Sequence, residues 1–263
     1  LIPHSPASPS IVSYVAMEKI GLAMPYYRQE FLMNQLGFTL PRETMANWII
    51  YVAGNYFYPI YERLHEELLK RDLVHADETT CQVLREKGRT AEQTSYMWLY
   101  TTGSDALTPI VLYDYQPSRK GSCAQNFLEG FRGLVQCDGY QGYNKLGKTV
   151  NYAQNHHDTL MNYLLDGRCE ISNNRAERKA KSYAIGRKAF LFHTSETGDG
   201  ASAVMYSIVE TAKANNLNIF QYLYTVLLYM PDYTNSSAGI EQLMPWSEFI
   251  KEQCSGLIDV ESN

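Results

Sequence analysis

The sequence has few cysteines, and their spacing does not indicate a cross-linked or zinc-stapled protein. The five are scattered and never in C-x-x-C spacing, a pattern that suggests neither a disulfide framework nor a zinc knuckle. A large excess of one charge is also missing, since 23 Lys and Arg against 28 Asp and Glu give a net charge of −5. This excludes a histone-like polycation, so nucleic acid could be held only by a local patch. We expect a reducing, cytoplasmic environment.

A long hydrophobic run is missing as well. The most apolar stretch, near Ile219 to Met230, is interrupted by Gln221 and is far shorter than the ~20 residues that cross a bilayer. The first residues lack the basic and then apolar pattern of a secretion signal. We therefore predict a soluble protein with no membrane partner. Its 263 residues are enough for one large domain or two small ones.

The first 72 residues predict a linker followed by helices. Residues 1–10 contain three prolines and read as an extended linker. Apolar residues then recur at helical spacing on either side of a turn that contains Gly37 and Pro41. Two helices joined by a tight turn are the outline of a helix-turn-helix, the form in which many proteins bind DNA. An antiparallel helix pair that merely packs would give the same pattern.

From residue 73 the pattern changes to short runs of β-branched and aromatic residues. Residues 73–77, 96–100 and 109–113 predict three successive strands, a helix follows over 123–131, and residues 134–138 predict a fourth strand. Residues 149–153 suggest a fifth. This order predicts an α/β fold with a mixed sheet and helices on its faces.

The remainder predicts mostly helix. Helices are expected over residues 158–165, 173–182, 201–215 and 218–230, with a separate element over 185–192. We expect residues 73–230 to form the core with these C-terminal helices and residues 231–263 to be a loosely attached tail.

Three acidic residues stand where an ordinary fold would not obviously place them. Asp77 interrupts an apolar strand, Asp138 ends another, and Glu177 lies one turn into a helix. If they met, each pair would repel by about 4 kcal/mol at 4 Å and an effective dielectric constant of 20. Such a cluster needs cations, and two Mg²⁺ ions held by carboxylates can stabilise the attacking and leaving oxygens of a phosphoryl displacement. Glu78 is expected on the opposite face of the strand.

Plainer interpretations of these residues remain open. Asp138 could be a turn residue, and Glu177 could close a capping box onto Asn174. Asp77 and Asp138 could also serve as the acid and base of a glycosidase, without a metal. Cys137 is interpreted as a small buried residue, and the pair His156 and His157 as surface residues rather than metal ligands.

A basic segment surrounds Glu177. Within residues 175–188, six cations stand against one acid, namely Arg175, Arg178, Lys179, Lys181, Arg187 and Lys188. Such a segment predicts contact with a phosphate backbone, without readout of base sequence. A solvated helix face is the alternative.

Several ordered motifs together resemble one family. They are His75–Thr79, Asp138–Tyr143, Asn173–Arg178, Ile185–Lys188 and Tyr206–Lys213, with Ala7–Ser10 and Tyr27–Glu30 near the start. Over nearly the whole chain they closely resemble the DDE transposases of bacterial insertion sequences in the insertion sequence 66 family.

The resemblance implies a ribonuclease H-like core with Asp77, Asp138 and Glu177 as the metal-binding triad. It also implies two Mg²⁺ or Mn²⁺ ions, strand transfer between transposon ends and target DNA, assembly into a homo-oligomer on DNA, and a place at the bacterial nucleoid.

The chain departs from this family in two ways. A cysteine-rich segment usual at the start is absent, and the sequence begins at Leu1, as if more sequence preceded it. Relatives also carry a longer stretch between the second aspartate and the glutamate, whereas Glu177 here follows Asp138 by 39 positions. The second departure leaves an alternative function, that of an impaired remnant which binds DNA without cutting it.

Overall fold

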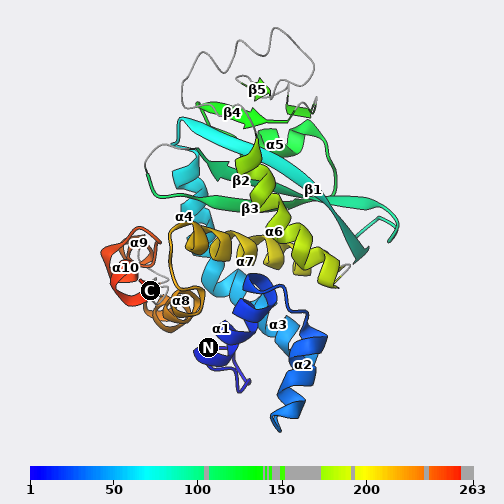
Figure 1. The fold of residues 1–263 in the computed structure, drawn as a ribbon, viewed down its shortest axis with the longest axis vertical. Helices are drawn as coiled ribbons and strands as arrows, with labels where there is room; N and C mark the ends of the chain where they lie inside the picture. Colours follow the sequence, from blue (N-terminus) through cyan, green and yellow to red (C-terminus); the bar gives the residue numbers. More distant parts are fainter. Residues whose placement is uncertain are drawn as a thin grey trace, which may run out of the picture.

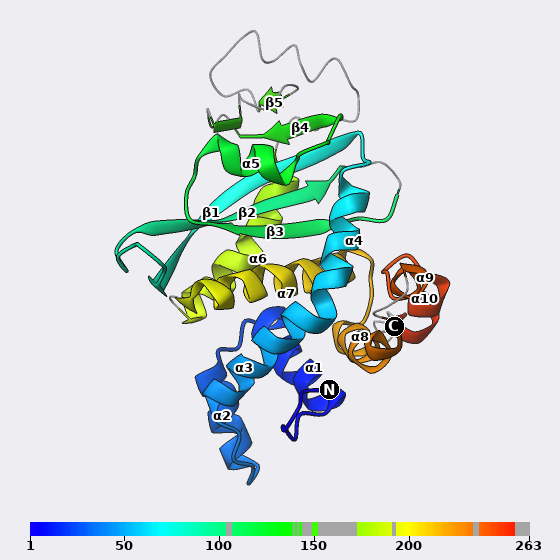
Figure 2. The ribbon, with the colours of Figure 1, turned by 180° about the vertical axis from the view of Figure 1, so that it is seen from behind.

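The structure, a computed structural model, describes residues 1–103, 107–138, 140, 142–143, 149–151, 173–190, 193–233 and 237–255. A twisted sheet occupies one half of the molecule and helices fill the other (Figure 1). Helix α6 covers one face of the sheet, and α5 covers the opposite face (Figure 2).

The N-terminal part is helical, as the sequence predicts. Its elements are α1 (Pro9–Ala16), η1 (Met17–Gly21), α2 (Tyr26–Gln35), α3 (Arg42–Val52), η2 (Ala53–Phe57) and α4 (Tyr58–Leu68). Ser8 caps α1 by accepting from the N–H of Ile11. Gly37 adopts a φ of 83° and ends α2 in a Schellman motif, in which the N–H of Phe38 donates to the carbonyl of Met33 at 2.9 Å.

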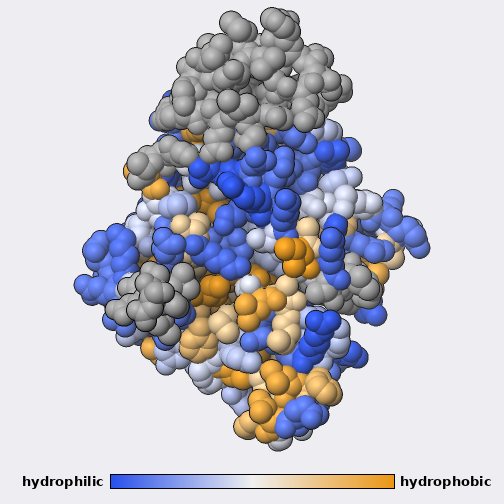
Figure 3. Space-filling model, in the orientation of Figure 1, coloured by the Kyte–Doolittle hydropathy of each residue, from blue (hydrophilic) through white to orange (hydrophobic). Residues whose placement is uncertain are grey.

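The helices of this N-terminal part do not stand apart from the rest of the molecule. Helix α1 packs against α8, and α3 and α4 pack against α7. Their buried residues belong to the same hydrophobic cluster as those of the sheet. The division predicted at residue 72 is therefore bridged by one continuous core. Helix α2 exposes apolar side chains, including Phe31 at 65% (Figure 3).

The described strands form a sheet of mixed direction. They are β1 (Leu73–Arg85), β2 (Thr94–Thr102), β3 (Val111–Gln116), β4 (Leu134–Cys137), β5 (Thr149–Asn151) and β6 (His193–Ser195). The order across the sheet is β3-β2-β1-β4-β5, and β6 pairs with the far part of β1. The β1–β2 and β2–β3 pairs are antiparallel, whereas β4 runs parallel to β1 and β5 parallel to β4. The predicted α/β class and mixed sheet are confirmed.

Strand β1 is longer than the sequence predicts, since it continues from Asp77 to Arg85. The added residues begin with the polar run Glu78–Thr80, and only Cys81 and Val83 among them are buried. They are strand because their backbone pairs with β2, as far as Gln82 opposite Thr94. Pairing across the sheet, which the local sequence does not encode, sets this boundary.

The edge strand β3 is covered by helix α7 (Glu196–Ala214). The N–H of Val111 donates to Thr211 Oγ1 at 3.0 Å, and the same hydroxyl donates back to the Val111 carbonyl. The N–H of Tyr113 donates to Ser207 Oγ at 2.8 Å. Two side chains one helical turn apart thus bind the outward-facing backbone of Val111 and the N–H of Tyr113.

Helix α6 (Asn174–Phe190) is one continuous helix, where the sequence predicts a break before residue 185. It passes through Gly186, a buried position. Packing against β1 and β2 outweighs the roughly 1 kcal/mol that glycine costs inside a helix. Helix α5 (Gly121–Phe127) is shorter than the helix predicted over residues 123–131.

The C-terminal residues are packed rather than loosely attached. Helix α8 (Ile219–Tyr233) is followed by α9 (Ser237–Gln242) and α10 (Glu248–Cys254). Leu243, Met244 and Ile250 are fully buried. The predicted tail therefore contributes to the core over residues 237–255, because apolar residues recur among its polar ones.

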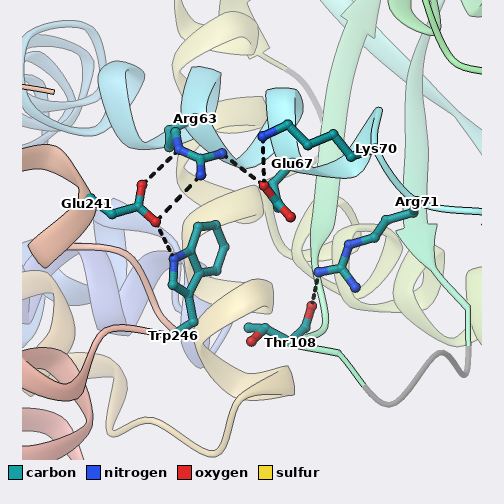
Figure 4. Close-up of polar contacts among 7 residues, drawn as sticks. All are labelled: Arg63, Glu67, Lys70, Arg71, Thr108, Glu241 and Trp246. Atoms are coloured by element: carbon teal, nitrogen blue, oxygen red, sulfur yellow. Dashed lines mark hydrogen bonds and ion pairs between the residues drawn. The ribbon is translucent and has the colours of Figure 1, made fainter. Parts of the chain in front are cut away.

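A polar cluster fastens these C-terminal helices to α4 (Figure 4). Arg63 Nε lies 2.9 Å from Glu241 Oε2, and Trp246 donates to the same carboxylate at 2.6 Å. The guanidinium also lies over the Trp246 ring, 5.5 Å from its centroid. No helix in the described part of the chain is long and apolar enough to cross a lipid bilayer.

Candidate active site

Of the two predicted catalytic aspartates, Asp77 lies on β1 and Asp138 directly follows the neighbouring parallel strand β4. His75 on β1 stands opposite Gln136 on β4. Asp77 and Asp138 each come two residues further along the chain. Side chains two residues apart share a strand face, so the register brings both carboxylates to the same side of the sheet.

Helix α6 brings Glu177 near Asp77, close enough for its charge to act on that carboxyl. The side-chain amide of Asn173 donates to the carbonyl of Ala76 at 3.0 Å, which ties the start of the helix to β1 beside Asp77. The N–H of Glu177 then donates to the Asn173 carbonyl at 3.1 Å, one turn later. The glutamate is exposed.

The electrostatics of Asp77 reflect the acidic residues around it. The pKa of Asp77 is raised from 3.8 to about 7, chiefly because the side chain is buried. The N–H of Glu78, which donates to Asp77 Oδ1 at 2.8 Å, opposes this rise. The carboxylates of Glu78, Asp138 and Glu177 add to it. Acidic side chains are thus concentrated around Asp77, between the interior strand β1 and the end of β4.

The oxygen atoms around Asp77 suit a hard divalent cation. Carboxylate oxygens are the ligands that Mg²⁺ prefers, and Asn173 Oδ1 is a further buried oxygen with no hydrogen-bond partner in the described part of the chain. Among the described residues, however, no three His, Cys, Asp or Glu side chains already lie close enough to hold an ion. The residues fit the metal in chemistry, and binding would require the carboxylates to draw together.

The structure supports the turn interpretation of Asp138 but not the capping-box interpretation of Glu177. Asp138 Oδ1 accepts from the N–H of Tyr140 at 3.1 Å, so the predicted turn role is real and leaves other carboxylate lone pairs available. Glu177 is the fourth residue of α6, which starts at Asn174. A capping box needs the third position after the cap, so the helix start does not explain this glutamate.

The six predicted DNA-binding cations divide into two groups. Arg178, Lys181 and Lys188 are exposed on α6. At 3.6 residues per turn, Lys181 and Lys188 lie nearly in line with Glu177, and Arg178 lies about 100° around the helix from it. Arg175 is half-buried. Hydrophilic residues cover much of the face that α6 presents (Figure 3).

The other cations bind within the protein. Lys179 Nζ lies 3.1 Å from Glu210 Oε2, a carboxylate whose side chain is 2% exposed and which also pairs with Lys213. Arg187 donates to Thr80 on β1, to its hydroxyl at 2.6 Å and to its carbonyl. These two cations attach α6 to α7 and to the sheet.

Family comparison places this arrangement among known proteins. The family described as Transposase IS66 family matches residues 4–149 and 144–201, and the IS66 C-terminal element matches residues 207–246. The chain belongs to the IS66 transposase family. No solved structure shows a significant match to it.

Three proteins of Sinorhizobium fredii are similar to this IS66 family chain. The uncharacterized protein y4qI is 22% identical, over 90% of this chain and 62% of its own length. The uncharacterized proteins y4jD and y4hP are 21% and 19% identical, over 92% and 93% of this chain and 66% and 63% of their own lengths. The chain thus spans less than two thirds of the length of these relatives.

The relatives also contain residues that have no counterpart here. The alignment with y4qI runs over 337 positions, more than the 263 residues of the chain. The match to the IS66 family is split at residues 144–149, between Asp138 and Glu177. This agrees with the short spacing of the two acids.

The sequence did not reveal the polar residues that meet on the face of β1 opposite Asp77. Glu78 is almost fully buried on the opposite face of β1, where Arg119 and Tyr143 bind it. The alternation of the strand predicts only that Glu78 faces away from Asp77. Its partners come from segments 41 and 65 residues away along the chain, and no local pattern marks them.

Two further candidates from the sequence were Cys137 as a nucleophile and the pair His156 and His157 as metal ligands. Cys137 is buried, and burial raises the pKa of its thiol, which makes it a poor nucleophile. His156 and His157, with the helix predicted over 158–165, lie outside the described residues.

Residues 142–149 match the letters of a phosphate-binding loop, G-x-x-x-x-G-K-T. Such a loop leads into a helix, whereas Thr149 here begins strand β5. The match lacks the structural context that phosphate binding needs.

Proposed function

We propose that this chain is a DDE-type transposase that cuts and joins DNA in a reaction dependent on Mg²⁺ or Mn²⁺. The observation that carries the proposal is the placement of Asp77 on β1, Asp138 directly after the parallel strand β4, and Glu177 on α6, near enough for the charges of the last two to act on Asp77. Membership of the IS66 transposase family supports it independently. The strand order β3-β2-β1-β4-β5, antiparallel and then parallel, is consistent with a ribonuclease H-like core.

In this proposal the triad would hold two divalent ions. Such ions polarise a phosphodiester and activate the attacking water or 3′-hydroxyl. Asp77 and Asp138 would supply oxygens from the rigid sheet, while Glu177 would supply one from the helix. The burial of Asp77 would limit the access of water to one side of the site. Bound cations would offset the mutual repulsion of the crowded carboxylates, and this relief favours ion binding.

The DNA backbone would lie along α6. Arg178, Lys181 and Lys188 form an exposed stripe that begins at Glu177 and extends over ~16 Å, at 1.5 Å per residue. Phosphates bound there would lead a strand directly to the triad. The pair α2 and α3, joined by residues 36–41, would help to recognise the transposon ends in the manner of a helix-turn-helix. We further expect assembly into a homo-oligomer on DNA, at the nucleoid.

A nicking assay tests the proposal. The substrate is supercoiled plasmid carrying the terminal repeats of the source locus, with Mg²⁺ or Mn²⁺ present. We expect Asp77→Asn, Asp138→Asn and Glu177→Gln each to lower nicking by more than about 100-fold, because even outer partners of metal ligands cost 10–100-fold. Chelation should abolish nicking, and added Mg²⁺ should restore it.

The matched control is Glu129→Gln, which neutralises an exposed carboxylate away from the triad. Full nicking by any triad variant would refute the assignment. If the wild-type chain retards the DNA in a gel but never nicks it, the impaired remnant is the correct function. The short stretch between Asp138 and Glu177 is the observation that favours this alternative.

A further inference from the structure

A buried polar network lies on the reverse of the strand that carries Asp77. Glu78, the next residue, turns its side chain to the opposite face of β1, where it is 2% exposed. Arg119 Nε donates to Glu78 Oε1 at 2.6 Å, and the Tyr143 hydroxyl donates to Glu78 Oε2 at 2.5 Å. Both carboxylate oxygens are thus occupied by strong donors.

Both partners of Glu78 hold the residues that follow β4. Tyr143 sits edge-on to Trp98, with ring centroids 5.6 Å apart. Arg119 stacks over the Tyr140 ring, 3.9 Å from its centroid, and the Tyr140 hydroxyl donates to the Arg119 carbonyl at 2.6 Å. The N–H of Tyr140 in turn donates to Asp138 Oδ1. A chain of contacts therefore leads from Glu78 to the Asp138 carboxylate.

Backbone packing supports the same placement. A side chain at Gly121, the first residue of α5, would collide with the carbonyl of Gly142. The segment after β4 is therefore seated directly against α5, with Tyr143 beyond it bound to the sheet. Its position is determined from both the backbone and the side chains.

We infer that Glu78, Arg119 and Tyr143 act as positioning residues that keep the Asp138 carboxylate level with Asp77 for divalent-metal binding. This inference rests on the proposed function. Asp77 and Asp138 repel each other without an ion, and Asp138 lies just past the last paired residue of β4. Glu78 couples the two, since its N–H binds Asp77 while its carboxylate anchors the segment that holds Asp138.

The first experiment measures Mn²⁺ binding to the full chain by electron paramagnetic resonance. Tyr143→Phe removes one hydroxyl without changing shape. We expect it to weaken Mn²⁺ binding by about 10-fold, the lower range for outer partners of metal ligands. Tyr222→Phe is the matched control, because that hydroxyl is also buried but donates to Leu243, remote from the site. It should bind Mn²⁺ as the wild type does.

The second experiment follows nicking against Mn²⁺ concentration. Tyr143→Phe should need about 10-fold more Mn²⁺ for half-maximal rate while reaching a similar rate at saturation. A purely structural defect would lower the active fraction and leave the half-maximal concentration unchanged. Arg119, whose side chain is 42% exposed, offers a second pair of variants that should fold. Arg119→Lys keeps the charge and should bind Mn²⁺ more tightly than Arg119→Gln.

The outcomes separate this inference from the proposed function. If Asp77→Asn loses Mn²⁺ binding but Tyr143→Phe and Arg119→Gln bind as the wild type does, the positioning role is wrong and the triad stands. If wild type and Asp77→Asn bind Mn²⁺ equally, the triad is not the metal site and the proposed function fails first. Loss of binding in Tyr222→Phe as well would show a general effect of removing hydroxyls and overturn the inference.

Discussion

Lys19 is a buried cation in the N-terminal helices. Lys19 lies in η1 and is 7% exposed, and its ammonium group lies 4.9 Å from the centre of the Tyr26 ring. Burial lowers the pKa of this lysine from 10.5 to about 7. The folded protein therefore gives up a proton that the unfolded chain retains between those two values.

We predict that Lys19→Met stabilises the protein in a pH-dependent way. Between pH 7 and 10.5 the unfolded state binds more protons, so wild-type stability rises with pH over that window. Below pH 7 the cost of burying the charge is fully present, and a shift of this size corresponds to at most about 5 kcal/mol. The advantage of the methionine variant should thus be largest near pH 6 and shrink by about pH 9.5.

Urea unfolding at these two pH values measures the effect. Lys251→Met is the control, because Lys251 is exposed on α10 and its loss should change stability by less than about 0.5 kcal/mol. A constant difference between Lys19→Met and wild type at both pH values would contradict the prediction.

Single residues also show what the sequence could reveal about the site. Asp77 was conspicuous because a charge in a run as apolar as residues 73–76 is seldom buried without a partner. Arg119 and Tyr143 carried no such signal. Their role arises only when segments distant in sequence meet behind β1, and contacts of that kind are set by the packed fold.

At the scale of elements, α6 combines two roles on two sides. Its buried side packs on the sheet, and Lys179 and Arg187 bind partners within the protein. Its exposed side presents Arg178, Lys181 and Lys188 beside Glu177. Along the sequence the six cations form one basic patch, and only the helix geometry separates them.

We predict that the exposed stripe governs the salt dependence of DNA binding. Replacing Arg178, Lys181 and Lys188 together with glutamine should weaken binding to duplex DNA. It should also flatten the plot of log affinity against log salt by about 0.9 for each phosphate that the variant no longer neutralises. Filter binding at several salt concentrations measures the slope. Lys251→Gln should leave it unchanged, and an unaltered slope in the triple variant would place the DNA elsewhere.

Local patterns predicted which elements exist better than where they end. The mixed sheet and the N-terminal helices follow from apolar periodicity and from turn residues such as Gly37. The extension of β1 past Asp77 and the passage of α6 through Gly186 do not, because pairing with β2 and packing on the sheet decide them. Glu78–Thr80 interrupt the apolar pattern of β1, and Gly186 interrupts the helical pattern of α6.

At the scale of the whole molecule, the cluster of Arg63, Glu241 and Trp246 joins the C-terminal element to the N-terminal helices. We predict that Arg63 and Glu241 are energetically coupled. Glu241 is 44% exposed, so solvent screening limits the coupling to about 0.5–1 kcal/mol. A double-mutant cycle with Arg63→Met and Glu241→Gln, measured by urea unfolding, gives this energy. Strictly additive effects would show that the two segments associate through apolar packing alone.

The hydroxyls of Ser207 and Thr211 bear on how copies of this protein can associate. Helical residues four apart are ~6 Å apart along the axis, and alternate strand residues are ~6.7 Å apart, so the helix imitates the spacing of a neighbouring strand. Val111 and Tyr113 consequently have no N–H left to offer to another chain. A second copy therefore cannot extend the sheet beside residues 111–113 of β3, because helix α7 of the same chain already occupies that backbone.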